Sequence, residues 1–296
     1  MIIDMHNDTA YRMYFEKEPL SENNFHIDLK KQNNLDFLLF YSIFIDPEKT
    51  NGDIDGYFYG IYDNFIKQAP EKYILTLEGG GFIDKIEKVD ILKELGIKSV
   101  TLTWNDSNKI ASSQMSGDIG GVTEFGYKVI DRMLENGIIP DLSHISDRSF
   151  YDVMNYIKKP VLVSHSNSRS LCSFPRNITD DMFLRVIENG GVTGINFCCD
   201  FLSDNNDASI SSIVNHIEHF LSLGGEDNIG FGSDFDGIPS LPEGINDISS
   251  FPKITEEMQK RKISEAIIEK ICCKNVMRIM EAYGTLPEYK IRRDLF

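Results

Sequence analysis

A histidine and an aspartate two residues apart, His6 and Asp8, stand near the start of the sequence, directly after the apolar run at residues 2–5. In a β-strand, side chains at positions i and i+2 point to the same side. An imidazole and a carboxylate at this spacing converge on one point, as two ligands of a single divalent metal do. The motif therefore predicts one half of a metal site at the end of a strand.

Two further histidines, His144 and His165, each follow an apolar run, at residues 138–142 and 161–163. In a β/α barrel, the carboxyl ends of the strands are where active sites are built. A lone histidine in such a place is more often a hydrogen-bonded structural residue than a ligand. With His6, however, three of the six histidines stand at predicted strand ends, and this grouping favours a metal site.

The other three histidines fit structural roles. His216 and His219 are three residues apart in a stretch of helical pattern, residues 211–223, which no strand-end carboxylate accompanies. Side chains at this spacing are neighbours on one helix face, and a solvated or capping role is the prediction for both. His26 stands in an irregular polar segment and receives no role.

Carboxylates also follow predicted strands. Glu78 ends the apolar run at 74–77 and precedes three glycines, which allow a tight turn and the close approach of a ligand. A glutamate there can bridge two cations, or it can be an ordinary residue at the start of a helix. Asp234 follows the run at 229–232 and fits either a metal ligand or a group that carries protons between water and a leaving group. Asp236 fits a supporting role or a simple turn.

Two arginines, Arg169 and Arg176, follow His165 in one polar segment. An arginine beside a metal site can bind both oxygens of a substrate carboxylate with its guanidinium group. The ordinary alternative for such an arginine is an ion pair on the protein surface. The residue pattern does not choose between the two arginines.

Eight short apolar runs recur along the chain and are separated by stretches of helical spacing. The predicted strands are residues 2–5, 37–45, 74–77, 99–104, 138–142, 161–163, 192–197 and 229–232. Start and stop signals predict helices at residues 53–67, 123–135, 179–188 and 264–282. This alternation predicts an α/β fold, the (β/α)8 TIM barrel, as a single domain over residues 1–296. An open doubly wound sheet would place a glycine-rich phosphate loop where residues 6–9 stand.

Composition restricts the partners and the location. The formal net charge is −16, with 46 acidic and 30 basic side chains, which argues against nucleic acid and anionic membranes as partners. No apolar run approaches the roughly 20 residues of a membrane span, and the first residues lack the pattern of a signal peptide. Five cysteines without zinc-like spacing indicate buried reduced thiols. A cytoplasmic protein fits these features best.

Six motifs carry a resemblance that covers nearly the whole chain. They are His6-Asn7-Asp8, Leu77-Glu78-Gly79-Gly80, Asp141-Leu142-Ser143-His144, Val163-Ser164-His165-Ser166, Arg176-Asn177-Ile178-Thr179-Asp180 and Gly230-Phe231-Gly232-Ser233-Asp234-Phe235-Asp236-Gly237. In this order and at these separations, the chain resembles the membrane dipeptidase (renal dipeptidase) family of zinc peptidases.

The resemblance implies a (β/α)8 barrel with two Zn²⁺ ions per chain, bridged by a glutamate. Carried over residue by residue, it implies that His6 and Asp8 bind one zinc. By the same likeness, His144 and His165 bind the other zinc, and Glu78 bridges the two. A histidine and carboxylate set would also suit Mn, Fe or Co.

The resemblance also implies roles around the metals. Arg176, rather than Arg169, matches the family's arginine for the terminal carboxylate of the substrate, and Asp234 matches its proton-transferring aspartate. One departure concerns substrate binding. Mammalian members have, after the Thr-Leu-Thr of the fourth strand, a histidine that contacts the substrate near the scissile carbonyl, and at this substrate-binding position the chain has Trp104. An indole donates one hydrogen bond but takes up no proton, so polarisation of the substrate carbonyl is expected to depend more on the metals.

The expected function is zinc-dependent hydrolysis of dipeptides, and whether these include a carboxyl-terminal D-residue is left open. The expected partners are a small peptide and, by resemblance, a second copy of the chain in a homodimer. No hydrophobic tail like the family's membrane anchor follows Ala282. Two alternatives stay open. They are another metal-dependent amide, lactone or ester hydrolase on the same barrel, and a non-catalytic binding protein.

Overall fold

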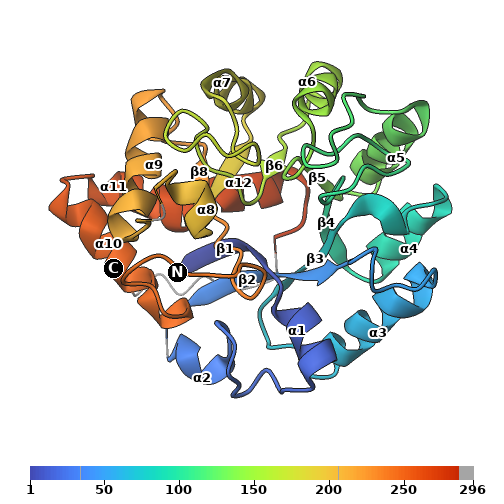
Figure 1. The fold of residues 1–296 in the computed structure, drawn as a ribbon, viewed down its shortest axis with the longest axis horizontal. Coiled ribbons are helices and arrows are strands. Elements are labelled where there is room, and N and C mark those ends of the chain that lie inside the picture. Colours follow the sequence, from blue (N-terminus) through green and yellow to red (C-terminus); the bar gives the residue numbers. More distant parts are fainter. Residues whose placement is uncertain (34, 206, 287–296) are drawn as a thin grey trace.

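The computed structural model of the chain describes residues 1–33, 35–205 and 207–286. Its centre is a closed barrel of eight parallel strands that pair in chain order (Figure 1). The last strand closes on the first where Asp4 stands opposite Phe231. The strands are β1 (Ile2–Asn7), β2 (Phe37–Phe44), β3 (Ile74–Glu78), β4 (Ile97–Thr101), β5 (Ile139–Asp141), β6 (Leu162–Val163), β7 (Val192–Ile195) and β8 (Ile229–Phe231).

Helices surround the barrel (Figure 1), and this confirms the predicted (β/α)8 fold. Residues 287–296 of the predicted domain lie outside the described residues. Among the described residues, no helix combines the length and the apolar character that crossing a bilayer requires. The α-helices are α1 (Thr9–Glu16), α2 (Leu29–Gln32), α3 (Ile54–Ile66), α4 (Glu87–Glu94), α5 (Glu124–Glu135), α6 (Asp147–Tyr156), α7 (Asp180–Asn189), α8 (Cys199–Leu202), α9 (Ile210–Ser222), α10 (Phe251–Lys260), α11 (Glu265–Glu269) and α12 (Asn275–Ala282). Two 3₁₀ helices, η1 (Gly80–Phe82) and η2 (Ile248–Ser250), and a π-helix, η3 (Lys270–Lys274), complete the set.

Polar residues begin three of the predicted helices. Asp53, Thr123 and Thr179 stand just before α3, α5 and α7, and each side chain accepts a hydrogen bond from the backbone N–H three residues on. Such a bond satisfies a donor that the first turn of a helix leaves without a partner. These three predicted helices are therefore confirmed to within one or two residues.

The helix predicted over residues 264–282 is interrupted. The chain forms α11, then the π-helix η3, then α12. Ile271, Cys272 and Cys273 are all buried, and three consecutive residues do not share the single buried face of a regular α-helix. The wider π-turn lets them all pack toward the barrel, where η3 contacts β1 and β8. The prediction of one continuous α-helix was wrong in this segment.

Two groups of buried apolar side chains hold the barrel together. The larger lies mainly between the strands and the surrounding helices. The smaller joins residues near the strand starts, such as Ile3, Leu38 and Val192, to Val276 and Ile279 of α12. The end of the barrel where the strands start is thus closed by apolar packing, and the opposite end is left for polar side chains.

Two predicted strands end two or three residues earlier in the structure. β4 pairs with β3 only as far as Thr101 opposite Glu78, and β7 pairs with β8 as far as Ile195 opposite Phe231. Trp104 therefore lies in the loop after β4. Loops at the carboxyl ends of barrel strands are the segments that build active sites.

Candidate metal centre

Five side chains predicted as metal ligands come together at the carboxyl end of the barrel. His6 belongs to β1 and Glu78 ends β3, whereas Asp8, His144 and His165 follow β1, β5 and β6. All five are buried, and none is more than 8% exposed. Buried polar groups need partners, so the partners of these atoms decide what the site can hold.

Glu78 lies between the other candidate ligands. Its Oε2 atom is 3.4 Å from Nε2 of His6. Its Oε1 atom is 3.0 Å from Nε2 of His144 and 3.6 Å from Nε2 of His165. The two carboxylate oxygens thus face separate imidazoles, an arrangement in which one carboxylate can contact two cations. Burial favours a raised pKa, but the charge of His6 outweighs it and lowers the pKa of Glu78, so this carboxyl group is ionised.

The hydrogen bonds of two histidine rings fix which nitrogen carries the proton. Nδ1 of His144 is 3.0 Å from Oδ1 of Asn105, and an amide oxygen only accepts hydrogen bonds, so this Nδ1 is the donor. Nδ1 of His165 is 2.7 Å from the hydroxyl of Ser164, which itself donates to Asp141. This Nδ1 is therefore also the donor. In the neutral rings, both Nε2 atoms are left unprotonated.

These two unprotonated nitrogens face each other and a carboxylate. Nε2 of His144 is 2.8 Å from Nε2 of His165, and both lie near Oε1 of Glu78. Burial lowers the pKa of His144 to about 3 and also lowers the pKa of His165, so protonation does not relieve the repulsion between the lone pairs. A divalent metal ion among these atoms fits the donor set.

A second set of ligand atoms surrounds His6. Its Nε2 atom is 3.9 Å from Oδ2 of Asp8 and 3.9 Å from Oδ1 of Asp234. Nε2 of His6 and Oδ1 of Asp8 are buried without a hydrogen-bond partner among the described residues. Burial and the charge of Glu78 raise the pKa of Asp8 to about 8, and burial raises the pKa of Asp234 to about 6. A cation here would hold these carboxyl groups ionised, and the ligand atoms of His6, Asp8 and Asp234 are close enough together to share one ion.

Two buried aspartates that the sequence reasoning did not assign hold the loops of the site. Asp4 accepts hydrogen bonds from the backbone N and the hydroxyl of Ser233, at 2.7 and 2.6 Å. Asp141 accepts bonds from the backbone N of Ser143 and of Ser164, at 3.1 and 2.9 Å. Each aspartate stands in a strand two or three residues before a candidate histidine, and a charged residue in such an apolar run was the signal for this role.

Three residues of the site have left-handed backbone conformations. The φ angles are 68° at His144, 62° at Asp234 and 70° at Asp236, and a non-glycine residue in this region is strained by about 1–2 kcal/mol. Asp236 accepts hydrogen bonds from Thr9 Oγ1 and from His26 N, both at 2.6 Å. Its own N–H donates to Nδ1 of His26 at 2.9 Å. His26, which had no predicted role, therefore fastens the loop that carries Asp234.

A cavity of about 310 Å³ opens over these residues. Arg176 lines it, is 5% exposed, and has Nε and Nη2 atoms without a hydrogen-bond partner among the described residues. Burial lowers the pKa of Arg176 to about 10, so the side chain is charged at neutral pH. A charged guanidinium group with free N–H donors is suited to bind the carboxylate of a ligand. Arg169 instead forms a paired contact with the carboxylate of Asp147, at 2.7 and 2.8 Å.

Trp104, predicted to contact the substrate, lies on the aromatic side of this cavity. The centre of its ring system is 4.9 Å from that of Phe44 and 6.4 Å from that of His144. The ring of Phe44 in turn lies 5.2 Å from the ring of Tyr11. An aromatic surface thus extends along the cavity from α1 to the loop after β4.

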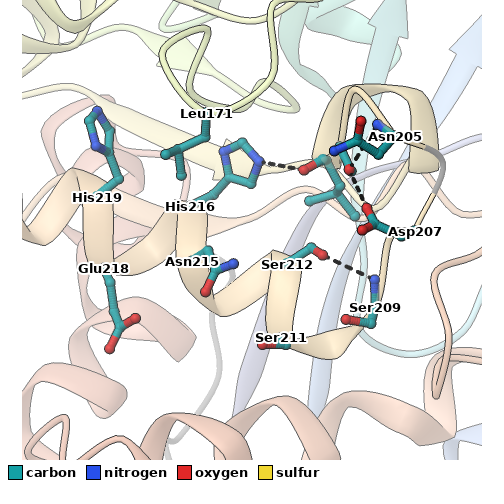
Figure 2. A pocket seen from close by; sticks show the side chains of 12 residues that line it. Leu171, Asn205, Asp207, Ser209, Ser211, Ser212, Asn215, His216, Glu218 and His219 are labelled. Atoms are coloured by element: carbon teal, nitrogen blue, oxygen red, sulfur yellow. Dashed lines mark hydrogen bonds between the residues drawn. The ribbon is translucent and has the colours of Figure 1, made fainter.

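His216 and His219 lie apart from this centre, on α9 beside a polar hollow of about 480 Å³ (Figure 2). Nε2 of His216 donates to the carbonyl oxygen of Leu202, and Ser168 N donates to Nδ1 of His216, both at 3.1 Å. His219 contacts Asp180 at 2.7 Å. Both histidines therefore have structural partners, but His216 is buried and not solvated as predicted.

The buried ring of His216 is expected to make the protein less stable in acid. Burial lowers the pKa of His216 to about 4, against about 6.5 in an unfolded chain. As the pH falls between these values, the unfolded chain binds a proton that the folded protein excludes, so stability decreases. Between pH 7 and 5, the native protein is expected to lose about 2 kcal/mol more unfolding free energy than the variant His216→Gln. Urea unfolding at both pH values checks this, and equal losses would contradict it.

The sequence relatives of this chain include two proteins that match it over more than half of its length. An uncharacterized dipeptidase of Schizosaccharomyces pombe is 35% identical over 192 residues, which are 62% of this chain and 46% of that protein. The match thus spans about half the length of the yeast protein. An uncharacterized protein encoded in the pqqA 5' region of Klebsiella pneumoniae is 30% identical over 219 residues, 70% of this chain and 80% of that protein.

Solved structures share the fold. A metallo peptidase from Rhodobacter sphaeroides, liganded with a phosphinate mimic of the dipeptide L-Ala-D-Ala, has a TM-score of 0.87 at 20% identity, over 95% of this chain and 99% of its own. The probable dipeptidase PvdM from Pseudomonas aeruginosa has a TM-score of 0.87 at 16% identity, over 97% and 96%. The sequence model of the membrane dipeptidase family (peptidase family M19) matches residues 62–289. The chain belongs to the membrane dipeptidase family.

Proposed function

We propose that the protein is a zinc-dependent dipeptidase that hydrolyses the peptide bond of dipeptides with two bound metal ions. The observation that carries this proposal is the position of Glu78, whose Oε2 atom faces His6 and whose Oε1 atom faces the unprotonated Nε2 atoms of His144 and His165. In this proposal, His6 and Asp8 would hold one ion, His144 and His165 would hold the other, and Glu78 would be a ligand of both. Imidazole and carboxylate ligands in a buried site suit zinc.

Asp234 is the proposed proton carrier. When bound, the metal ions supply Lewis acidity toward the peptide carbonyl and lower the pKa of water. Asp234 accepts a proton from the attacking water at Oδ1 and returns it to the leaving amine. Its other oxygen, Oδ2, accepts a hydrogen bond from Nδ2 of Asn196 at 2.9 Å, which keeps Oδ1 free for this exchange.

Arg176 is the proposed binding group for the terminal carboxylate of the substrate. Its unpaired donors in the cavity support this role. A volume of about 310 Å³ is at the lower end of the range for small-molecule pockets, about 300–1,000 Å³, and supports a substrate of dipeptide size. The L-Ala-D-Ala mimic bound to the R. sphaeroides peptidase supports dipeptides with a carboxyl-terminal D-residue. Trp104 is proposed to contact the other residue of the dipeptide.

A cytoplasmic location and a homodimer are further proposals. All five cysteines are free thiols, and burial raises the pKa of Cys198 and of Cys272 to about 12. Reduced, unreactive thiols are usual in cytoplasmic proteins. The homodimer stays a prediction, which the mass of the protein in solution tests.

Protein purified without chelators is expected to contain about two zinc ions per chain and to hydrolyse dipeptides. Elemental analysis measures the metal, and a panel of dipeptides with L- or D-residues at the carboxyl-terminal side measures the activity. Removing the metal with a chelator should abolish hydrolysis, and added zinc should restore it.

Two outcomes of these measurements would contradict the proposal. Metal-loaded protein that cleaves amides, lactones or esters but leaves every dipeptide intact would be a different hydrolase on the same barrel. Protein that binds no metal and cleaves none of these substrates would instead be a binding protein that keeps the family's fold.

A further inference from the structure

A second cavity lies beside the one that Asp8, Glu78 and His144 line, which we call the catalytic cavity. Its volume is about 570 Å³. The apolar side chains of Ile45, Pro47, Ile54 and Ile83 line it together with the charged residues Asp84, Asp106 and Lys109. Among the described residues, Trp104 is the one residue that lines both cavities. None of the residues with a proposed role in metal binding or proton transfer lines the second cavity.

Neighbouring residues along the chain face the two cavities. Phe44 and Glu78, the last residues of β2 and β3, line the catalytic cavity, whereas Ile45 and Gly79 line the second. Successive side chains of an extended strand point to opposite sides, as those of Phe44 and Ile45 do at the end of β2. The cavities therefore lie back to back across the ends of these strands, and Trp104 stands between them.

Trp104 is held in this place by packing alone. A Cβ atom on Gly79, which has a φ angle of 88°, would lie 3.6 Å from Cβ of Trp104, so the chain passes close beside the tryptophan. The ring also packs against Phe44. Its N–H forms no hydrogen bond with another described residue. Shortening the side chain therefore leaves no buried donor or acceptor without a partner.

The order of strands in the barrel indicates which part of a substrate meets Trp104. In the closed order β1 to β8, β2 and β3 lie across the barrel from β6 and β7. Arg176 follows β6, while Trp104 packs beside the ends of β2 and β3. A dipeptide whose carboxylate is bound by Arg176 would thus extend across the barrel and place its amino-terminal residue at Trp104.

We propose that Trp104 is a specificity-determining partition, which keeps the side chain of the amino-terminal residue of the substrate out of the cavity behind it. This inference rests on the proposed dipeptidase function. With the indole in place, the catalytic cavity accepts dipeptides with a small first residue. Without the indole, a large apolar side chain reaches Ile45, Ile54 and Ile83 in the second cavity.

The test compares dipeptides that share one carboxyl-terminal residue and begin with alanine, leucine or phenylalanine. Trp104→Ala is expected to raise the kcat/KM ratio of the phenylalanine to the alanine substrate by about 10-fold or more, because the new space buries an aromatic side chain. Trp104→Phe retains an aromatic partition and should change the ratio little. Adding Ile54→Phe to Trp104→Ala refills the second cavity and should return the ratio toward the native value.

The outcomes for the partition and for the proposed function are separable. An unchanged ratio in Trp104→Ala, with a native protein that cleaves the alanine substrate, overturns the partition alone. A native protein that cleaves no dipeptide overturns the proposed function. The partition is then tested by measuring whether the native protein binds the alanine and the phenylalanine dipeptide. Trp104 is the single tryptophan of the chain, so its fluorescence should change with the alanine dipeptide but not with the phenylalanine one. Equal responses overturn the partition.

Discussion

Replacing Asp234 with asparagine is expected to lower kcat for dipeptides about 100- to 10,000-fold, the usual contribution of a positioned acid–base group. Asparagine has the shape of aspartate, but its amide neither takes up nor returns a proton. It also tolerates the left-handed backbone of Asp234, with a φ angle of 62°, and its amide oxygen can accept the bond from Asn196. The variant should therefore fold normally, and steady-state kinetics measure the loss.

Metal analysis of the same variant separates two roles for this residue. A proton carrier can be changed without loss of metal, and Asp234→Asn is then expected to keep the native metal content. Asp234 is, however, close enough to His6 and Asp8 to share an ion with them. Loss of one ion per chain would therefore make it a ligand, whereas native turnover would remove it from the mechanism.

A matched control removes a carboxylate nearby without touching the cavity. Asp200 lies on α8, is exposed, and does not line the catalytic cavity. Asp200→Asn changes the net charge by the same amount as Asp234→Asn and is expected to keep native kcat. A similar loss in both variants would trace the effect to charge and not to proton transfer.

The barrel could be predicted from the sequence because its signals are local. Each buried strand is a short apolar run, and side chains such as Thr123 and Thr179 that begin helices act on backbone groups three residues away. The alternation of these two kinds of segment indicates the fold class without any knowledge of which residues touch.

Strand ends and the π-turn could not be predicted because they depend on contacts between distant segments. β4 ends at Thr101 since its pairing with β3 and β5 ends there. The π-turn around Cys272 follows from packing against β1 and β8, which lie far away in the sequence. A residue pattern contains no direct record of such contacts.

The candidate site shows the same division. The positions of His6, Glu78 and His165 at strand ends were enough to predict that these residues lie together. The structure places their ligand atoms within reach of a single ion. The bonds that orient the site were not visible in advance, because they join residues far apart, as His26 and Asp236 are. The metal-binding roles themselves stay predictions, and elemental analysis tests them.

The two arginines after β6 show what geometry adds to the sequence. Arg169 donates to the carbonyl oxygens of Pro175 and Asn177, at 3.0 and 2.7 Å, and pairs with Asp147. It therefore braces the chain on both sides of Arg176 and has its donors engaged. Arg176 keeps free donors toward the cavity. The sequence placed both residues near the site but could not assign one to the loop and the other to the ligand.

Replacing Arg176 with methionine is expected to reduce kcat/KM for dipeptides about 30- to 3,000-fold, mainly through KM. The loss corresponds to about 2–5 kcal/mol for removing one partner of a buried charge pair. Methionine is apolar and of similar length, and exchanging a buried charge for it does not by itself destabilise the fold. Steady-state kinetics on the best dipeptide of the panel measure the effect.

A dipeptide amide, which lacks the carboxylate, shows whether the loss comes from this contact. The native protein should prefer the free acid to the amide by a factor similar to that lost in Arg176→Met, and the variant should lose the preference. Arg169→Met loosens the loop that carries Arg176, so any decrease there should leave a clear preference for the acid. If Arg176→Met still prefers the acid as strongly as the native protein does, another group binds the carboxylate, and the free donors of Arg176 have a different partner.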